Sequence, residues 1–134
     1  MLSSNTIEDV MTPYPYSIEI DAHLTTVRTM MMQFKIRHLP VREGEKWVGV
    51  VTEQQLDMAQ TLGVDLSVSS NVRIRDLCRH NAYSVAPGTP LAEVLRDMAE
   101  RSVDTVLVVK EGRLLGIFTA TDALKRYAGL LNRQ

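Results

Sequence analysis

The segment GIFTATD, residues 116–122, places an aspartate three residues after a threonine, at Thr119 and Asp122. Threonine is favoured at the residue that precedes a helix, so this spacing predicts that the Asp122 carboxylate lies in a first helical turn. Free backbone N–H groups and the helix dipole favour negative groups there. A carboxylate in this position can accept two hydrogen bonds from a cis-diol such as that of ribose. The pattern predicts a helix end that binds a sugar or phosphate; the alternative is that Asp122 only stabilises the helix.

The segment GVVTEQQ, residues 49–55, repeats this pattern with Gln55 at the position of Asp122. The offset is 67 residues. Without a gap it aligns ten identical residues over 7–58 and 74–125, where about three are expected by chance. This offset is longer than the units of solenoid proteins, so we predict a doubled small domain. Gln55 is neutral and longer than aspartate, which makes it a poorer acceptor for a diol.

The elements that position these residues follow from hydrophobic spacing. Leu24, Val27 and Met31 are spaced as one apolar stripe of a helix, and residues 91, 94 and 98 repeat it. For the second of these helices Thr89 is the predicted N-cap and Pro90 the predicted first residue. Two short apolar runs across a glycine-containing loop then predict a β-hairpin in each repeat, at 38–51 and 104–118. A further helix is predicted after each repeated threonine.

Each repeat therefore has the order strand, helix, hairpin, helix, which predicts a mixed α/β fold. We assign residues 1–64 to the first repeat, 65–72 to a linker and 73–134 to the second repeat. A domain of about sixty residues is marginally stable alone. The two repeats are therefore expected to pack together, with pseudo-two-fold symmetry.

A pair of β-α-β-β-α repeats, each ending in glycine, two apolar residues, threonine, two variable residues and a polar residue, resembles a known family. It is similar to a tandem cystathionine-β-synthase (CBS) domain pair, also called a Bateman module. The segments DVMTPYPYSI (9–18) and IRHLPV (36–41) resemble that family's opening M-T-P segment and its H-x-P-V strand. The resemblance covers nearly the whole chain. It implies a regulatory sensor that binds an adenosine-containing ligand in the cleft between the repeats and that often dimerises into a flat disc.

The resemblance also implies that the aspartate of one repeat faces the early strands of the other. The ligand-binding residues implied in this way are Asp122, Thr119, Thr12, Tyr16, Ile36, Arg37, His38 and Pro40. The pseudo-equivalent second site comprises Thr52, Gln55, Arg79, Val103, Asp104 and Thr105. A phosphate would meet Arg37 in the first site and the like charge of Asp104 in the second. We therefore predict one binding site and one degenerate site.

Charge and composition argue against several other classes. The net charge is −1, from fifteen basic and sixteen acidic residues without a block of either sign, which does not favour nucleic-acid binding. The single cysteine, Cys78, excludes an internal disulfide and is expected to be a small buried side chain in a cytoplasmic protein. We expect no signal peptide and no membrane span. The three histidines lack the spacing of a metal site.

No nucleophile motif, P-loop or dinucleotide fingerprint is present in the sequence, so no catalytic activity is expected. The leading hypothesis is a non-catalytic regulatory module that binds AMP, ADP, ATP or S-adenosylmethionine; no cofactor is assigned with certainty. The alternative is a dimerising interaction module with unoccupied pockets. The apolar stripes of four helices exceed what two small units can bury, so a homodimer is expected, with contributions from residues 27–34 and 94–101.

Overall fold

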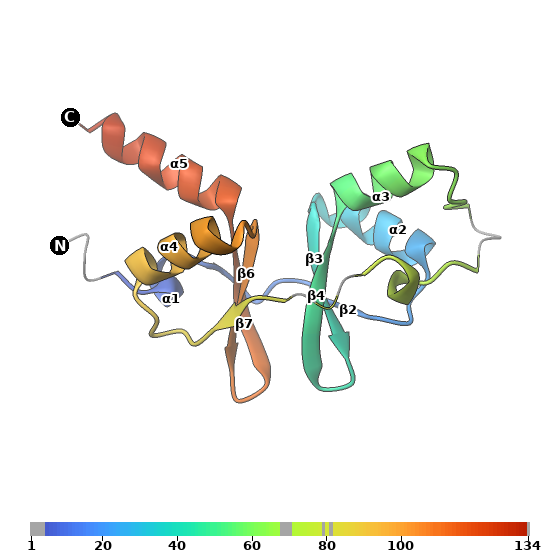
Figure 1. The fold of residues 1–134 in the computed structure, drawn as a ribbon, viewed down its shortest axis with the longest axis horizontal. Coiled ribbons are helices and arrows are strands. Elements are labelled where there is room, and N and C mark those ends of the chain that lie inside the picture. The colour runs from blue at the N-terminus through green and yellow to red at the C-terminus, as the bar shows by residue number, and fades with distance from the viewer. Residues whose placement is uncertain (1–4, 68–70, 79, 81, 134) are drawn as a thin grey trace. The chain divides into compact units, whose positions relative to one another are not determined.

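The computed structural model describes residues 5–67, 71–78, 80 and 82–133, and the chain divides into two compact units. One contains residues 16–82 and is called the glutamine unit here, because it holds Gln55. The other contains residues 1–15 and 83–134 and is called the aspartate unit, because it holds Asp122. Each unit combines a small sheet with helices, as the mixed α/β prediction requires (Figure 1).

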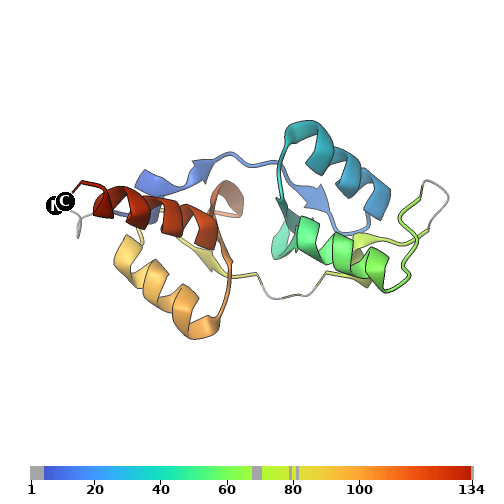
Figure 2. The ribbon, with the colours of Figure 1, turned by 90° about the horizontal axis from the view of Figure 1, so that it is seen from above.

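The glutamine unit is built on a three-stranded sheet in the order β2–β3–β4. Strand β2 (Ile18–Glu19) runs parallel to β3 (His38–Glu43), and β3 forms an antiparallel hairpin with β4 (Lys46–Thr52). Helices α2 (Leu24–Phe34) and α3 (Glu53–Thr61) pack on this sheet (Figure 2). The buried core takes side chains from α2, β3, β4 and α3, from the residue after β2 and from the segment after α3: Ile20, Leu24, Val27, Met31, Leu39, Val41, Val51, Leu56, Ile74 and Cys78.

The aspartate unit is built on a four-stranded sheet in the order β1–β7–β6–β5. Strands β6 (Thr105–Lys110) and β7 (Arg113–Thr119) form the hairpin, with β5 (Ser84–Val85) parallel to β6 and β1 (Thr12–Pro13) antiparallel to β7. The helices are α1 (Ile7–Val10), α4 (Leu91–Arg101) and α5 (Ala120–Leu131). Its buried core consists of Ile7, Tyr83, Val94, Met98, Val106, Val108 and Phe118.

The first residues of each sequence repeat pack in the unit that is formed mainly by the other repeat. The Ile7 N–H donates a hydrogen bond to the Thr89 carbonyl (2.9 Å), and the Ile7 side chain is fully buried in the aspartate-unit core. In the same way, the 3₁₀ turn Ile74–Asp76 lies in the glutamine unit, where the Ile74 N–H donates to the Ala22 carbonyl (2.9 Å). Each compact unit therefore takes its N-terminal anchor from the other repeat.

The helices and hairpins predicted from spacing are present, but the predicted start of α4 is wrong. The helix begins at Leu91 and its N-cap is Pro90, not Thr89. The Thr89 hydroxyl donates to the Ala86 carbonyl (2.7 Å), so this threonine closes the preceding turn. Both other predicted caps, Thr52 and Thr119, are confirmed.

Part of the predicted linker, 65–72, is described by the structure. Leu66 and Val72 pack against the glutamine-unit core, and the Asp65 carboxylate accepts a hydrogen bond from the Ser67 N–H (2.8 Å). Residues 68–70 lie outside the described residues. The described ends of this segment are thus anchored to the glutamine unit.

Candidate functional site

Helix α5 begins at a capping box in which Thr119 and Asp122 satisfy each other's backbone. The Asp122 N–H donates to Thr119 Oγ1 (3.2 Å), and the Thr119 N–H donates to Asp122 Oδ2 (2.8 Å). These reciprocal bonds hold both partly buried side chains in fixed positions. Among the described residues, Asp122 Oδ1 has no hydrogen-bond partner. One carboxylate oxygen therefore stabilises the helix and the other is available to accept a hydrogen bond.

Helix α3 begins in the same way, with glutamine in place of aspartate. The Gln55 N–H donates to Thr52 Oγ1 (3.1 Å), and the Thr52 N–H donates to Gln55 Oε1 (3.0 Å). The side-chain amide nitrogen of Gln55 has no partner within the part of the chain that the structure describes. This nitrogen is a donor and carries no charge. The two capping boxes are alike. The side-chain atom that takes no part in capping is a hydrogen-bond acceptor at α5 and a donor at α3.

An acidic residue lies beside the start of α5. The Ala120 N–H donates to the Asp104 carbonyl (2.8 Å), and Thr105 lies opposite Thr119 in the β6–β7 hairpin. The Asp104 side chain is exposed. Within the aspartate unit, the helix end that carries Asp122 therefore has a second carboxylate nearby, on the residue just before β6.

A basic residue occupies the equivalent place beside the start of α3. The Glu53 N–H donates to the Arg37 carbonyl (2.9 Å), and His38 lies opposite Thr52 in the β3–β4 hairpin. Arg37 Nε lies 4.0 Å from Glu53 Oε1, and the Arg37 side chain is 81% exposed. An ion pair this long and this exposed holds the guanidinium weakly, so it remains free to meet an anionic ligand group.

Thr12 lies on β1, which reaches β7 only because the motif glycine leaves space. Thr12 pairs with Ile117 and Pro13 pairs with Gly116. A Cβ atom at Gly116 would clash with the Met11 side chain and would stand 3.0 Å from the Thr12 carbonyl oxygen. The glycine that opens the segment GIFTATD therefore permits the close approach of the strand that carries Thr12.

Two equivalent tyrosines, Tyr16 and Tyr83, have different surroundings. The Tyr16 ring stacks on Phe34, with ring centroids 4.0 Å apart and planes 8° apart, and half of its surface stays exposed. Tyr83 is buried, its hydroxyl donates to Asp97 Oδ2 (3.1 Å), and the Arg101 guanidinium lies 4.7 Å from its ring centroid. Burial and the hydrogen bond to Asp97 raise the pKa of Tyr83. The Tyr16–Phe34 pair offers an exposed aromatic surface; Tyr83 is enclosed.

Phe34 was not among the residues predicted for the site. The signal that would have found it is the repeat itself, because Phe34 and Arg101 are equivalent at the offset of 67 and each contacts its own tyrosine.

The structure distributes the predicted site residues over both compact units. Thr12, Thr119 and Asp122 lie together in the aspartate unit, whereas Tyr16, Ile36, Arg37, His38 and Pro40 lie in the glutamine unit. Ile36 packs partly against the glutamine-unit core, and Pro40 is buried in β3. Of the predicted second site, Thr52 and Gln55 lie in the glutamine unit and Val103, Asp104 and Thr105 in the aspartate unit. Arg79 lies outside the described residues.

The cysteine and the three histidines are the remaining side chains that could have a chemical role. Cys78 is buried as predicted, and its burial raises the pKa of the thiol, which is unfavourable for a nucleophile. The histidines lie on separate elements: His23 precedes α2, His38 begins β3, and His80 lies 3.7 Å from Glu43. In the described part of the chain, no three His, Cys, Asp or Glu side chains are grouped in a way that could hold a metal ion.

Comparison with known proteins identifies both repeats. The model of the CBS domain family matches residues 7–60 and again residues 74–129. An uncharacterized conserved protein from Pyrococcus horikoshii is 26% identical, with a TM-score of 0.78 over 95% of each chain. The CBS domain pair of protein MJ0100, solved with 5′-methylthioadenosine and S-adenosyl-L-methionine, is 20% identical, with a TM-score of 0.75 over 93% of this chain and 97% of that one. These matches confirm the tandem CBS pair and its mixed α/β fold.

The curated relatives are longer proteins. Homoserine O-acetyltransferase from Methanococcoides burtonii is 28% identical over 123 residues, which are 90% of this chain and 24% of that protein. Inosine-5′-monophosphate dehydrogenase from Korarchaeum cryptofilum is 28% identical over 121 residues, which are 90% of this chain and 23% of that protein. The chain thus spans about a quarter of these relatives. No helix among the described residues is long and apolar enough to cross a membrane.

Proposed function

The chain belongs to the CBS domain family, and from this premise we propose that it is a regulatory module that binds an adenosine-containing ligand between its two repeats. The ligand class is an adenine nucleotide or S-adenosylmethionine. A CBS domain pair of the same fold has been solved with two adenosyl compounds, which supports this class. CBS pairs are generally regulatory and not catalytic, and we extend this to the present chain, which we place in the cytoplasm.

The observation that carries the proposal is the unused carboxylate oxygen of Asp122. Because Oδ2 is engaged by the Thr119 N–H, the capping box presents Oδ1 in a fixed position. A ribose hydroxyl would donate to this oxygen, and a hydrogen bond to a charged acceptor contributes about 1.5–3 kcal/mol. Thr12, on the strand beside β7, is the second polar side chain that the aspartate unit would offer.

The glutamine unit would supply the groups for the base and the phosphate. The exposed face of the stacked Tyr16 is a surface on which an adenine ring can stack. Among the described residues the Arg37 guanidinium has only a long contact to Glu53, and it is suited to a phosphate or carboxylate. His38 and Pro40, on β3, and Ile36, just before this strand, complete the proposed site.

The second set of residues is proposed to be degenerate. Gln55 presents an amide donor where Asp122 presents a carboxylate acceptor, so a diol would lose its charged partner there. Tyr83, at the position of Tyr16, is buried under Arg101 and bonded to Asp97. The negative charge of Asp104 would repel a phosphate.

Regulation would follow from differential binding. A ligand held by residues of both units favours the arrangement of the units in which all of its contacts form, and it shifts the population by its difference in affinity. The module would transmit this shift through association with a second copy, that is, as a homodimer.

Isothermal titration with AMP, ATP and S-adenosylmethionine tests the proposal. Asp122→Ala should weaken the ligand that binds wild type by about 10- to 150-fold, which corresponds to one hydrogen bond to a charged group. Gln55→Ala is the matched control, because it removes the same kind of capping bond from α3 and should leave affinity unchanged. Equal affinity in wild type and Asp122→Ala would contradict the site. Absence of binding by all three compounds would favour the interaction module with unoccupied pockets.

A further inference from the structure

The backbone of Phe34 is held in place at the end of helix α2. Phe34 is the last residue of the helix, and Lys35 caps it in the left-handed conformation, with a φ of 55°. The N–H groups of Lys35 and Ile36 both donate to the Met31 carbonyl, the second over 3.1 Å. These bonds close the last turn and fix the direction in which the Phe34 side chain leaves the backbone. The chain then continues directly into the residues of the proposed site on β3.

The ring of Tyr16 lies flat against this fixed side chain. The centroids of the Tyr16 and Phe34 rings are 4.0 Å apart and their planes differ by 8°, so Phe34 covers one face of the Tyr16 ring. Half of the Tyr16 surface remains exposed. Within the part of the chain that the structure describes, the Tyr16 hydroxyl forms no hydrogen bond that could orient the ring. We therefore attribute the orientation of the ring plane to the stack on Phe34.

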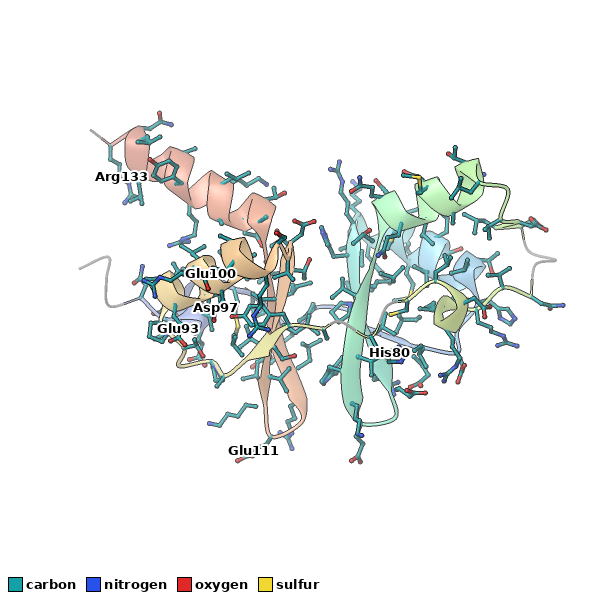
Figure 3. The ribbon with its side chains drawn as sticks, viewed as in Figure 1. His80, Glu93, Asp97, Glu100, Glu111 and Arg133 are labelled. Atoms are coloured by element: carbon teal, nitrogen blue, oxygen red, sulfur yellow. The ribbon has the colours of Figure 1, made fainter. Side chains whose placement is uncertain are left out.

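The aspartate unit has the same backbone at this position but a different side chain. Arg101, the equivalent of Phe34, ends α4, and Ser102 follows it with a φ of 54°. The Arg101 guanidinium lies 4.7 Å from the Tyr83 ring centroid, and the Tyr83 hydroxyl donates to Asp97, which lies on α4 (Figure 3). Each unit thus uses this position to contact its own tyrosine. In the glutamine unit the contact is a ring, and it leaves the tyrosine half exposed.

A half-exposed ring binds a planar base best when its orientation is set before the ligand arrives. Stacked aromatic rings require nearly parallel planes. A side chain that is ordered only on binding loses conformational entropy at that moment, which weakens the affinity. Because Phe34 already holds the Tyr16 ring, the open face of that ring is preorganised for a planar partner.

We propose that Phe34 is a positioning residue of the ligand site, which holds the Tyr16 ring so that the adenine of the ligand stacks on its open face. The inference rests on the proposed function and specifies how the glutamine unit recognises the base. It also gives Phe34 a role that core packing does not explain, because Phe34 is partly exposed and is not one of the buried core residues.

Proton NMR of the ligand tests this role. Ring currents shift the ring C–H protons of adenine upfield when the base stacks on an aromatic face. A titration yields both the dissociation constant and the shift at saturation, and the second value reports stacking independently of affinity. The titrant is the compound among AMP, ATP and S-adenosylmethionine that binds wild type, since all three carry adenine.

Phe34→Leu removes the stack but keeps an apolar side chain at the helix end. It should weaken binding about 5-fold or more, the lower end of the range for losing one base–aromatic stack, and it should reduce the upfield shift at saturation. Phe34→Gln, with a side chain suited to a partly exposed helix end, should do the same if the leucine variant does not fold. Phe34→Tyr retains a ring and should preserve both values. Arg101→Leu, at the equivalent position of the aspartate unit, is the matched control and should leave both unchanged.

The outcomes separate this inference from the proposed function. Asp122→Ala should weaken binding through the ribose and leave the shift at saturation unchanged. A Phe34→Leu protein with weaker binding but an unchanged shift at saturation would show that Phe34 only supports the fold, and would overturn the positioning role alone. Unchanged affinity together with an unchanged shift would do so as well. A wild type that binds none of the three compounds would overturn the proposed function together with this inference.

Discussion

Tyr16 and Tyr83 occupy the same position of the repeat, yet one side chain is half exposed and the other is buried. Tyr16 stacks on Phe34, whereas Tyr83 lies under Arg101 and donates its hydroxyl to Asp97. Both tyrosines pack within their units, but only in Tyr83 is the hydroxyl hydrogen-bonded to a neighbouring carboxylate and the ring covered by a guanidinium. The difference shows that a repeated position can keep its place in the fold while its side chain changes from half exposed to buried.

The two capping boxes show the same division between fold and function. Thr52 and Thr119 are identical, and both N3 residues accept a hydrogen bond from the threonine N–H. Capping requires only one acceptor atom from the N3 side chain. The second atom is free to differ, and it is an amide nitrogen in Gln55 and a carboxylate oxygen in Asp122. Substitutions at Gln55 and Asp122 are therefore expected to have similar effects on stability but different effects on ligand binding.

The largest expected difference concerns how the last helix of each unit is anchored. Leu56 is fully buried, whereas its equivalent Ala123 is partly buried and lines a groove of about 460 Å³ between α4 and α5. Leu56→Ala should lower the free energy of unfolding by about 2–5 kcal/mol, because it leaves a cavity in a closed core. Ala123→Leu should change it by less than about 1.5 kcal/mol, because the added atoms enter an open groove. Urea denaturation measures both; similar losses for the two variants would show that α5 is packed as tightly as α3.

The next effect tests the capping boxes as ligand groups. Asp122→Gln retains a capping acceptor, so stability should change little, but nucleotide binding should weaken by about 1.5–3 kcal/mol.

Wild type should bind one nucleotide per chain by calorimetry. Gln55→Asp alone should leave that stoichiometry at one, because Asp104 still repels phosphate, and adding Asp104→Arg should create a weak second site. Saturation of wild type at two equivalents of equal affinity would show that Gln55 does not disable a site.

Local elements of both units could be predicted from the sequence, whereas contacts between distant segments could not. The helical stripes, both hairpins and the caps Thr52 and Thr119 follow from local spacing, which is why they are confirmed. The exchange of N-terminal anchors was not predicted. Ile7 and Ile74 precede strands of only two residues, too short for any periodicity, and their partners are distant in the sequence.

Two further details that the sequence did not reveal have a similar origin. Thr89 fits the composition of an N-cap, but its hydroxyl bonds to the preceding turn, a choice that depends on backbone geometry. Phe34 belongs to the apolar stripe of α2, and nothing in that spacing shows that its ring stacks on Tyr16. Comparison of the repeats with each other carries more information about such positions than the spacing within either one.

A smaller effect is expected from the two tyrosine hydroxyls. Tyr83→Phe removes the hydrogen bond to Asp97 at a partly buried position and should cost about 1 kcal/mol of unfolding free energy. Tyr16→Phe should cost almost nothing in stability, because half of the Tyr16 surface is exposed. Chemical denaturation of both variants under identical conditions checks the difference. Equal costs would mean that the enclosure of Tyr83 does not distinguish the units.

The smallest expected effect is a pH dependence confined to the glutamine unit. Arg75 donates from Nε to Asp21 Oδ1 (2.8 Å), and its Nη2 lies 2.7 Å from Glu43 Oε2. The Arg75 guanidinium lowers the pKa of both carboxyl groups, and His80 near Glu43 adds to this. The equivalents of Arg75, Asp21 and Glu43 in the other unit are Glu8, Gly88 and Lys110, which cannot form this network.

Because the folded-state pKa values of Asp21 and Glu43 lie below the unfolded ones, their contribution to stability is present above the unfolded pKa values. It is lost as the pH falls through the folded ones. Wild type should therefore lose unfolding free energy as the pH is lowered from about 5 to about 3. Arg75→Gln should make this slope shallower, whereas Lys110→Gln, at the position equivalent to Glu43, should leave it unchanged. Exposure and salt screening keep the effect small, so denaturation midpoints should be compared at low ionic strength. Identical slopes for Arg75→Gln and wild type would show that the Arg75 network contributes nothing to the difference between the units.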